Sequence, residues 1–364
     1  MALIGSRKIG ESYVLGWCWI IIFLFCSSNS HFAEASDNIH CQKLKLVDFE
    51  DRISVSKSDF STDLKVIKSG LLPIAELSAF AAAPGSDPTK SGFIAVSDRD
   101  PKLWRTNKLD LKNSSKFPSA IETLTDLLHP MGFLLSECVE NSSKFCRKTR
   151  EGLSAQWEGA DIDQNQQLWL LQESTESVHI FDSDATQRHT IINLEGASPK
   201  GVTSPPFLFL KDKENTLYEG IHIISNQQFL LAQQAGPSAL VLFEIKNNPS
   251  TENRFPQIRM AKASKSWHLP SPYQNCTLSE LASFEDNFFL LSPSCHVILK
   301  VQLNTNLAQL EATEVLSHPS YLEHAEALLV LSSHQFLVGL DGKDGDQDNV
   351  FLLEASPPLE APPP

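Results

Sequence analysis

Two sets of acidic residues recur along this chain in positions where they could meet. One set begins a short apolar run and the other follows the next run along the chain: Glu122, Glu151, Glu219 and Glu326 in the first set, and Asp98, Glu137, Glu173 and Asp341 in the second. In an antiparallel hairpin, the start of the first strand and the end of the second lie at the same edge. Carboxylates gathered there repel one another unless a cation intervenes, and Ca²⁺ prefers oxygen ligands. We therefore expect an acidic, calcium-binding mouth. The alternative is that the glutamates accept backbone N–H bonds from neighbouring strands.

Residues 341–349 form the densest acidic cluster of the chain. Aspartates at every second position from 344 to 348 have the spacing that begins an EF-hand loop. However, Asn349 stands where that loop needs glycine, and Ala355 stands at its twelfth position. The segment is therefore not an EF-hand, and we predict either a looser calcium site or a polar hairpin loop made of turn formers. The candidate metal ligands are Asp341, Asp344, Asp346 and Asp348.

The elements that must position these acids are short strands in a repeated meander. Each copy opens with Ser or Glu, a variable residue and a large apolar residue, and a turn and a second apolar run follow. The copies begin at Ser78, Glu122, Glu151, Glu219, Ser279 and Glu326. Meanders repeated around an axis make a β-propeller, and its first strands line a central channel. We predict an all-β propeller over residues 36–354 with six blades. Five is the alternative because the copy at Glu122 is compressed.

The two ends of the chain carry different expectations. Arg7 and Lys8, the apolar run at residues 13–25 and the small-residue site before Ser36 are typical of a cleaved signal peptide over residues 1–35. The run is shorter than the roughly 20 residues that a spanning helix needs. We predict export without a stable membrane span; the alternative is an uncleaved N-terminal anchor. Residues 44–49 are expected to supply the last blade's missing strand and close the ring, and the proline-rich residues 355–364 are expected to be disordered.

The net charge limits the classes of partner, and the cysteines predict disulfides. The net charge of −14 argues against nucleic acid and anionic membrane surfaces. A small anionic ligand bridged by a cation, or another protein, remains as a partner. For an exported chain we predict the local disulfides Cys138–Cys146 and Cys276–Cys295, which leave Cys41 odd.

The meander openings also resemble those of a known family. Glu151-Gly152-Leu153, Glu219-Gly220-Ile221 and Glu326-Ala327-Leu328, with the strand endings at residues 95–99 and 170–174, are similar to the phytase-like and SdiA-regulated-protein propellers of exported bacterial proteins. The resemblance implies a propeller, and some members of the family cleave phosphoesters or esters. Gln233-Gln234 and Ser292-Pro293 depart from it, because they stand where a carboxylate is expected.

The sequence lacks the familiar catalytic signatures, namely GxSxG, HExxH, the Walker A motif and GxGxxG. The leading hypothesis is therefore an exported binding module with an acidic mouth. One alternative is a hydrolase of phosphate or carboxylic esters, in which cations polarise the bond and activate water. The cations would be held by Glu151, Glu173, Glu326 and Asp341. The other alternative is a purely structural cell-surface interaction domain.

Overall fold

The computed structural model describes thirteen stretches of the chain: residues 53–55, 61–83, 85–98, 102–106, 109, 121–126, 156–173, 176–195, 218–234, 238–246, 257–303, 310–342 and 348–356. The chain divides into two units, Met1–Asp48 and Phe49–Pro364, and every described residue belongs to the second. The predictions for residues 1–35, residues 44–49, Cys41 and the pair Cys138–Cys146 fall outside the described residues. None of the helices in the described part is long and apolar enough to cross a membrane.

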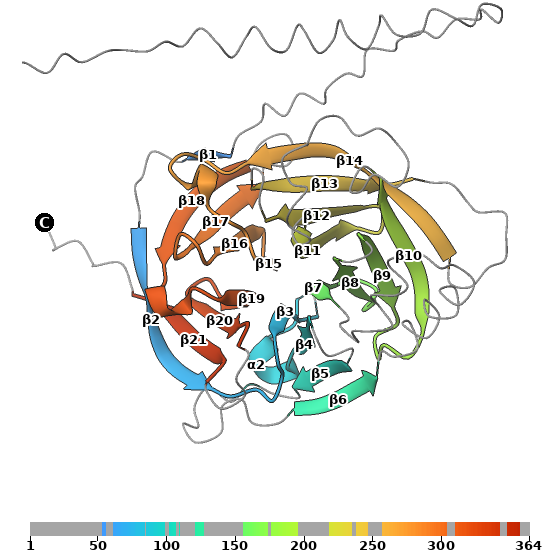
Figure 1. Cartoon of the computed structure of the whole chain (residues 1–364), viewed down its shortest axis with the longest axis horizontal. Helices are drawn as coiled ribbons and strands as arrows, with labels where there is room; N and C mark the ends of the chain where they lie inside the picture. The colour runs from blue at the N-terminus through green and yellow to red at the C-terminus, as the bar shows by residue number, and fades with distance from the viewer. Residues whose placement is uncertain are drawn as a thin grey trace, which may run out of the picture. The chain divides into compact units, whose positions relative to one another are not determined.

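Antiparallel meanders of four strands are the building unit of the fold (Figure 1). Short runs of Leu, Val, Ile and Phe between turns suit strands that are buried on both faces. Blade 1 consists of β3 (Leu77–Ala81), β4 (Ile94–Ser97), β5 (Lys102–Thr106) and β6 (Ile121–Asp126), with the short helix α2 (Pro88–Ser91) between β3 and β4. Blade 2 consists of β7 (Trp157–Ile162), β8 (Leu168–Gln172), β9 (Ser177–Phe181) and β10 (Arg188–Glu195).

The remaining blades follow the same order from the inner to the outer strand. Blade 3 consists of β11 (Tyr218–Ser225), β12 (Gln228–Gln233), β13 (Ala239–Ile245) and β14 (Gln257–His268). Blade 4 consists of β15 (Glu280–Phe284), β16 (Asn287–Ser292), β17 (Val297–Leu303) and β18 (Leu310–Ser317). Blade 5 consists of β19 (Ala325–Ser332), β20 (Gln335–Leu340), β21 (Val350–Ala355) and, from the other end of the chain, β2 (Ser61–Gly70). The 3-10 turns Tyr273–Asn275 and Ser320–Leu322 lie in the connections before β15 and β19.

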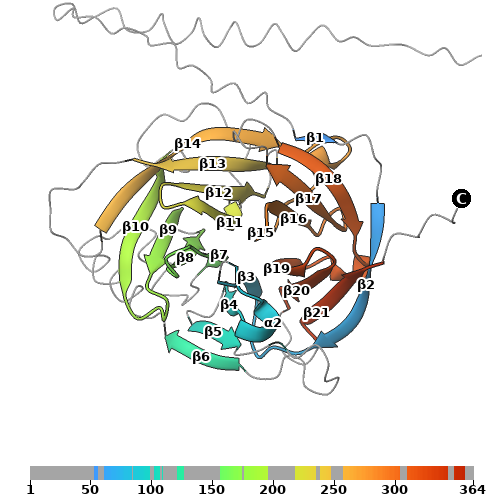
Figure 2. The same cartoon turned by 180° about the vertical axis from the view of Figure 1, so that it is seen from behind.

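The five blades close into a ring. Each of the inner strands β3, β7, β11, β15 and β19 contacts the next one, and β19 contacts β3 again. A separate apolar cluster fills each of the five interfaces: Trp157 packs with Val96 between blades 2 and 1, and Leu329 packs with Phe80 between blades 5 and 1. Figures 1 and 2 show the inner strands gathered around the centre from both sides. The described residues therefore form a β-propeller whose core lies between blades.

An N-terminal segment fastens three blades at the outer edge. The Ile53 N–H donates to the His268 carbonyl oxygen at 2.9 Å, and Ile53 packs in the cluster between blades 3 and 4. The two-residue strand β1 (Ser54–Val55) then pairs with β18. Strand β2 pairs in parallel with β18 through its first residues and antiparallel with β21 through the rest. An N-terminal strand thus completes the last blade, and it is residues 61–70 that do so.

Three sequence expectations need correction. The copy that begins at Glu122 is not a blade of its own. Glu122 lies in β6, the outermost strand of blade 1, and stands opposite Arg105 of β5 in the strand register. The described residues therefore contain five blades, the alternative count, and not six. Blade 2 has its inner strand at Trp157–Ile162 and not at residue 151. Finally, Ala355 belongs to β21 and pairs with Leu64, so the proline-rich tail begins later than predicted.

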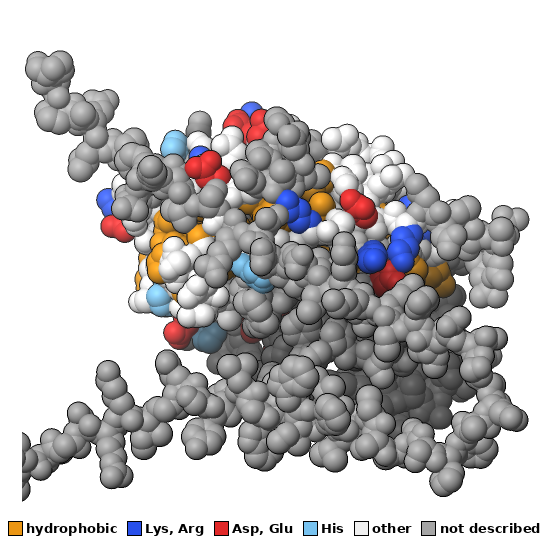
Figure 3. Space-filling model, turned by 90° about the horizontal axis from the view of Figure 1, so that it is seen from above, with side chains coloured by type: hydrophobic (Ala, Val, Ile, Leu, Met, Phe, Trp, Pro, Cys, Tyr) orange, Lys and Arg blue, Asp and Glu red, His pale blue; other side chains and the backbone are white. Residues whose placement is uncertain are grey.

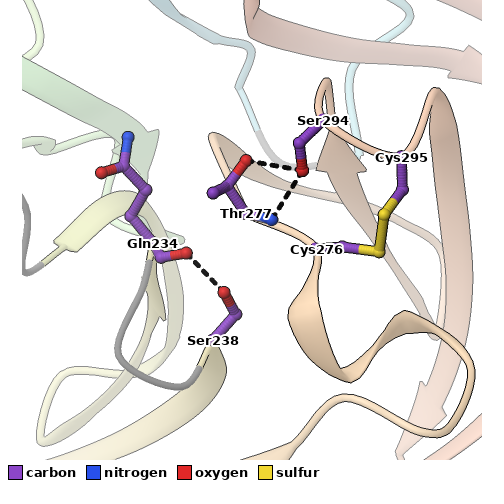
Figure 4. Close-up of a disulfide and its surroundings, with 6 residues drawn as sticks. All are labelled: Gln234, Ser238, Cys276, Thr277, Ser294 and Cys295. Carbon is purple, nitrogen blue, oxygen red and sulfur yellow. Dashed lines mark hydrogen bonds between the residues drawn. A yellow bond between two sulfur atoms is a disulfide. The ribbon is translucent and has the colours of Figure 1, made fainter. Parts of the chain in front are cut away.

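The predicted disulfide Cys276–Cys295 is confirmed, and it links the segment before β15 to the β16–β17 turn (Figure 4). Beside it, the backbone N–H of Thr277 donates to Ser294 Oγ at 2.8 Å, and the hydroxyl of Thr277 lies at the same distance from that atom. Among the described residues visible in Figure 3, basic and acidic side chains are interspersed.

Candidate functional site

A bulge at the start of four of the five inner strands sets the geometry of the candidate site. In four blades, the register between the inner and second strands shifts by one residue, at Ser78, Glu158, Glu219 and Glu326. The extra residue of a bulge is unpaired in its own ladder, so its side chain can be turned toward a neighbour. Ser279 holds the equivalent place in blade 4. The Ser78 hydroxyl donates to the Trp157 carbonyl oxygen, and the Ser279 hydroxyl donates to that of Ala325 at 2.9 Å. Each serine thus ties its blade to the next.

The ends of the second strands lie beside these bulges. Three backbone N–H groups donate to backbone carbonyl oxygens here: Asp98 to Glu76 at 3.0 Å, Glu173 to Gln156 at 3.0 Å, and Asp341 to His324 at 2.9 Å. Each acceptor stands two residues before a bulge position. The hairpin geometry predicted from the sequence therefore holds in blades 1, 2 and 5, and in blade 5 it brings together one acid of each set, Glu326 and Asp341.

Six carboxyl groups form what we call the acidic ring: Asp98, Glu158, Glu173, Glu219, Glu326 and Asp341. Besides burial, the charges of four other members raise the pKa of Glu158, and Glu219 has the largest effect of the four. Glu326 is most strongly influenced by Asp341. Glu158 and Glu219 are buried, whereas the other four are half-buried and reach solvent. The ring is thus a concentration of carboxyl groups drawn from four of the five blades.

Burial makes ionisation of these groups unfavourable. Loss of hydration, followed by the charge of Glu173, raises the pKa of Glu219 from 4.5 to about 8. Loss of hydration and the neighbouring Asp341 raise the pKa of Glu326 to about 9. The pKa of Glu158 is also well above its usual range, for the same two reasons. The side chains of Glu158 and Glu219 are hydrogen-bonded to each other, so one of the pair holds a proton. Around neutral pH these glutamates therefore carry protons in place of full charge.

A seventh acid, Glu280, lies beside the ring at the start of β15. The residue after each bulge is small in the other blades: Ala79, Gly159, Gly220 and Ala327. Glu280 fills the room that Gly220 leaves, because a Cβ on Gly220 would lie 2.8 Å from Glu280 Oε1. Burial raises the pKa of Glu280 well above its usual range, and the charges of Asp161, Glu219 and Glu326 add to the effect.

One oxygen of Glu280 is satisfied and the other is not. Oε1 accepts the backbone N–H of Leu281 at 2.9 Å. Oε2 is buried and has no hydrogen-bond partner among the described residues, and the same is true of Asp341 Oδ1. Buried polar atoms in native proteins nearly always have a partner. These two oxygens therefore call for a donor or a cation that the described residues do not supply.

Next to Glu280, an Asp–His pair connects blades 2 and 3. Asp161 Oδ2 lies 2.9 Å from His222 Nδ1 and accepts the backbone N–H of Ile223 at 2.8 Å. Asp161 Oδ1 accepts the N–H of Ile162 at 2.8 Å. The His222 ring packs against Phe288, with ring centroids 5.1 Å apart. Asp161 is thus fully engaged in holding the two inner strands together.

The acidic loop does not gather its described members around one point. The carboxyl of Asp341 faces Glu326, whereas Asp348 accepts a hydrogen bond from Ser69 at the outer strand β2. Asn349 is buried and structural: its Oδ1 accepts the Leu72 N–H at 2.7 Å, and its Nδ2 donates to the carbonyl oxygens of Leu72 and Ile74. Asp344 and Asp346 lie outside the described residues.

The described acids do not fit a calcium ion. Ca²⁺ takes six to eight oxygen ligands at roughly 2.3–2.6 Å. Within the described stretches, no group of three or more His, Cys, Asp or Glu side chains could hold a metal ion. The carboxyl groups of the ring are gathered, but they are not focused on a common centre.

The predicted site residues thus divide into three groups. Asp98, Glu173, Glu219, Glu326 and Asp341 come together in the acidic ring; Glu122 and Asp348 lie on outer strands or beside them; Glu137, Glu151, Asp344 and Asp346 fall outside the described residues. Sequence reasoning missed Glu158 and Glu280. The dipeptide Glu158-Gly159 repeats Glu219-Gly220 and could have identified the first. The second had no such signal, because Ser279 fits the repeat and Glu280 occupies its variable position.

Comparisons with known proteins show no family. No protein-family model matches the sequence, and no curated protein matches it. Among solved structures, the glutaminyl cyclase of Myxococcus xanthus is 11% identical, with a TM-score of 0.46, over 82% of this chain and 100% of its own. The aldose sugar dehydrogenase of Streptomyces coelicolor, in its PQQ-bound form, is 10% identical, with a TM-score of 0.40, over 80% and 98%. A streptogramin B lyase is 8% identical, with a TM-score of 0.37, over 80% and 97%. The propeller assignment rests on the strand pairing described above, and the phytase-like resemblance stays a prediction.

Proposed function

We propose that this chain is an exported β-propeller binding module whose acidic ring binds a cationic ligand. The observation that carries the proposal is the pair of buried, unpartnered oxygens, Glu280 Oε2 and Asp341 Oδ1, among six further gathered carboxyl groups that include Asp161. Export is supported by the disulfide Cys276–Cys295, since disulfides persist in oxidising compartments.

A cation relieves the energetic problem that the ring creates. Moving several carboxylates out of water is unfavourable, and the free protein avoids it by keeping protons on the glutamates. A bound cation replaces those protons and gives the ionised oxygens a partner. The half-buried members Asp98, Glu173, Glu326 and Asp341 give such a ligand a route from solvent.

The proposal is tested by thermal melts with a panel of cations, namely Ca²⁺, Mg²⁺ and a polyamine, at constant ionic strength. A ligand that binds only the folded state stabilises it by RT ln(1 + [L]/Kd), which is about 2.7 kcal/mol at one hundred times Kd. At least one cation is expected to raise the melting temperature of the wild type, and Glu326→Gln is expected to remove the shift. Glu311→Gln is the matched control, because Glu311 is the exposed residue of the outer strand β18. An unchanged melting temperature with every cation would contradict cation binding, and the hydrolase and the structural cell-surface domain would remain.

A calcium site in the acidic loop is a separate part of this proposal, because two of the four loop aspartates lie outside the described residues. A calcium site in the loop 341–349 would be selective for Ca²⁺ over the polyamine and would be lost in Asp344→Asn. Glu326→Gln would leave it unchanged, because Glu326 is not in the loop.

Hydrolysis of phosphoesters or esters is the second candidate. The observation in its favour is the hydrogen-bonded pair Glu158–Glu219, since two carboxyl groups that share a proton can act as acid and base. A panel of generic phosphate and carboxylic esters tests it. Turnover that is lost in Glu219→Gln, with the melting temperature retained, would support hydrolysis over simple binding.

A further inference from the structure

The carboxyl groups around the inner strands influence one another in pairs, some between blades and one within a blade. Glu158 of blade 2 meets Glu219 of blade 3, and both are members of the acidic ring. Glu280 of blade 4 is influenced by Asp161 of blade 2 more than by any other charge. Within blade 5, Glu326 faces Asp341. Negative charge is thus distributed over several small centres and is not concentrated at one.

This distribution separates two kinds of cation. A metal ion such as Ca²⁺ needs many oxygens around a single point, and the described acids offer no set of three that could provide them. An ammonium group needs only two or three acceptors, because it carries three N–H donors in one compact charge. Buried oxygens without a hydrogen-bond partner among the described residues, such as Glu280 Oε2 and Asp341 Oδ1, match the second need better than the first.

The free oxygens also require a directional donor. Glu280 is held in place by the Leu281 N–H on one oxygen and by the space over Gly220, so its Oε2 has a fixed position. A fixed, buried acceptor gains most from an N–H that points at it, since charge-assisted hydrogen bonds are roughly twice as strong as neutral ones. A quaternary ammonium ion, which has no N–H group, would supply the charge but leave Oε2 without a donor.

From these observations, and resting on the proposed function, we infer that the ligand of the acidic ring is a protonated amine with free N–H groups, and that Glu280 is the residue that selects it. The chemical class includes diamines, polyamines and lysine side chains of a basic peptide. Glu326 and Asp341 supply the solvent-facing part of the site, and Glu280 receives the N–H of the inserted ammonium group.

The test compares 1,5-diaminopentane with its permethylated bis-quaternary analogue, which has the same charge and no N–H, and with Ca²⁺. Binding to the full-length protein is measured by calorimetry at fixed pH and ionic strength. We expect the diamine to bind at least tenfold more tightly than the permethylated analogue. Glu280→Gln should weaken the diamine tenfold or more, because a hydrogen bond to a charged group contributes roughly 1.5–3 kcal/mol and 1.4 kcal/mol is tenfold. Glu311→Gln is the matched control and should bind like the wild type.

Three outcomes separate the inference from the function on which it rests. Equal affinity for the diamine and its permethylated analogue would show a purely electrostatic site and overturn the role of N–H donors. Binding of Ca²⁺ without binding of the diamine would overturn the amine inference and keep the cation-binding function. Binding of neither would end both. If Glu280→Gln does not fold, Asp341→Asn serves as the second variant, and an unchanged diamine affinity there would count against the inference.

Discussion

At the scale of single residues, the approach of neighbouring inner strands depends on missing side chains. A Cβ on Gly220 would lie 2.3 Å from the backbone nitrogen of Leu281 in the next blade and 2.8 Å from Glu280 Oε1. Contacts under 3.0 Å force the backbone or the neighbouring side chain to move. Gly220 therefore fixes both the spacing of blades 3 and 4 and the position of the acid that we assign to ligand selection.

Replacing Gly220 by alanine should accordingly destabilise the protein. Gly220→Ala is expected to lower the free energy of unfolding by roughly 1–3 kcal/mol, the usual effect of overpacking a filled site. Urea denaturation monitored by tryptophan fluorescence measures it. Gly342→Ala is the control, because its nearest neighbour, Asn349 Cβ, lies 4.0 Å away. Equal unfolding midpoints for the two variants would contradict the close approach of the inner strands.

Single residues also show which parts of the candidate site cannot be predicted from the sequence. Repetition identifies Glu219 and Glu326, because each stands at the same place in its blade. It does not identify Glu280, whose carboxyl bends back over Gly220 of another blade. Nor does it identify the role of Asn349, which in the sequence only interrupts a calcium motif. In the structure its side chain is hydrogen-bonded to the backbone of the connection between β2 and β3. Such roles arise from contacts between distant segments, and local spacing carries no record of them.

At the scale of elements, the disulfide secures the entry into blade 4. It closes a loop between residues that are 19 positions apart, and it encloses β15 and β16. Cross-linking a loop of that size restricts the unfolded chain by about 3 kcal/mol in the chain-entropy account. The double variant Cys276→Ser/Cys295→Ser should therefore melt several degrees lower than the oxidised wild type.

A thermal melt with and without reductant measures this effect. The wild type in reductant is expected to melt at the temperature of the double variant, and the variant is expected not to respond to reductant. A wild type that is insensitive to reductant, with both thiols shown by mass spectrometry to be free, would show that the link contributes nothing to stability.

The elements also show which parts of the fold can be predicted from sequence. Apolar runs between turns marked β4, β8, β9, β12, β13, β16 and β20 correctly, because each is buried on both faces and flanked by turn formers. The outer strands were harder to assign. Strands β2 and β14 alternate exposed with half-buried residues and pair in parallel with strands of another blade. Such pairing depends on how the blades are placed and not on local pattern. The copy at Glu122 misleads for another reason: its opening residues match the repeat, but its strand β6 pairs antiparallel with β5 as the outermost strand of blade 1.

At the scale of the whole molecule, the ring of blades brings together acids that are far apart in the sequence. Asp98 and Asp341 belong to opposite ends of the domain, yet both influence Glu326. Blade 5 joins the two ends because β2 completes it, so the acidic ring exists only when the propeller is closed. Opening the ring and ionising the buried acids are therefore linked, and the linkage gives the protein a definite dependence on pH.

The sign of that dependence follows from the protons bound in each state. Glu219 and Glu326 have pKa values of about 8 and about 9 in the folded protein and 4.5 in the reference state, so the folded state holds protons that the unfolded chain releases. Their contribution to stability is complete below pH 4.5, declines as the pH rises, and is lost above the folded values. Each such group changes the free energy of unfolding by at most about 1.4 kcal/mol per pH unit.

Without added cations, we therefore expect the melting temperature to fall steadily between pH 5 and pH 8 at constant ionic strength. The double variant Glu219→Gln/Glu326→Gln should flatten this slope, because a glutamine needs no proton to be neutral. A saturating cationic ligand should also reduce it, since the ligand takes the place of the protons. A melting temperature that rises from pH 5 to pH 8 would mean that these carboxyl groups are ionised and already partnered in the free protein, and the case for a cation site would fail with that result.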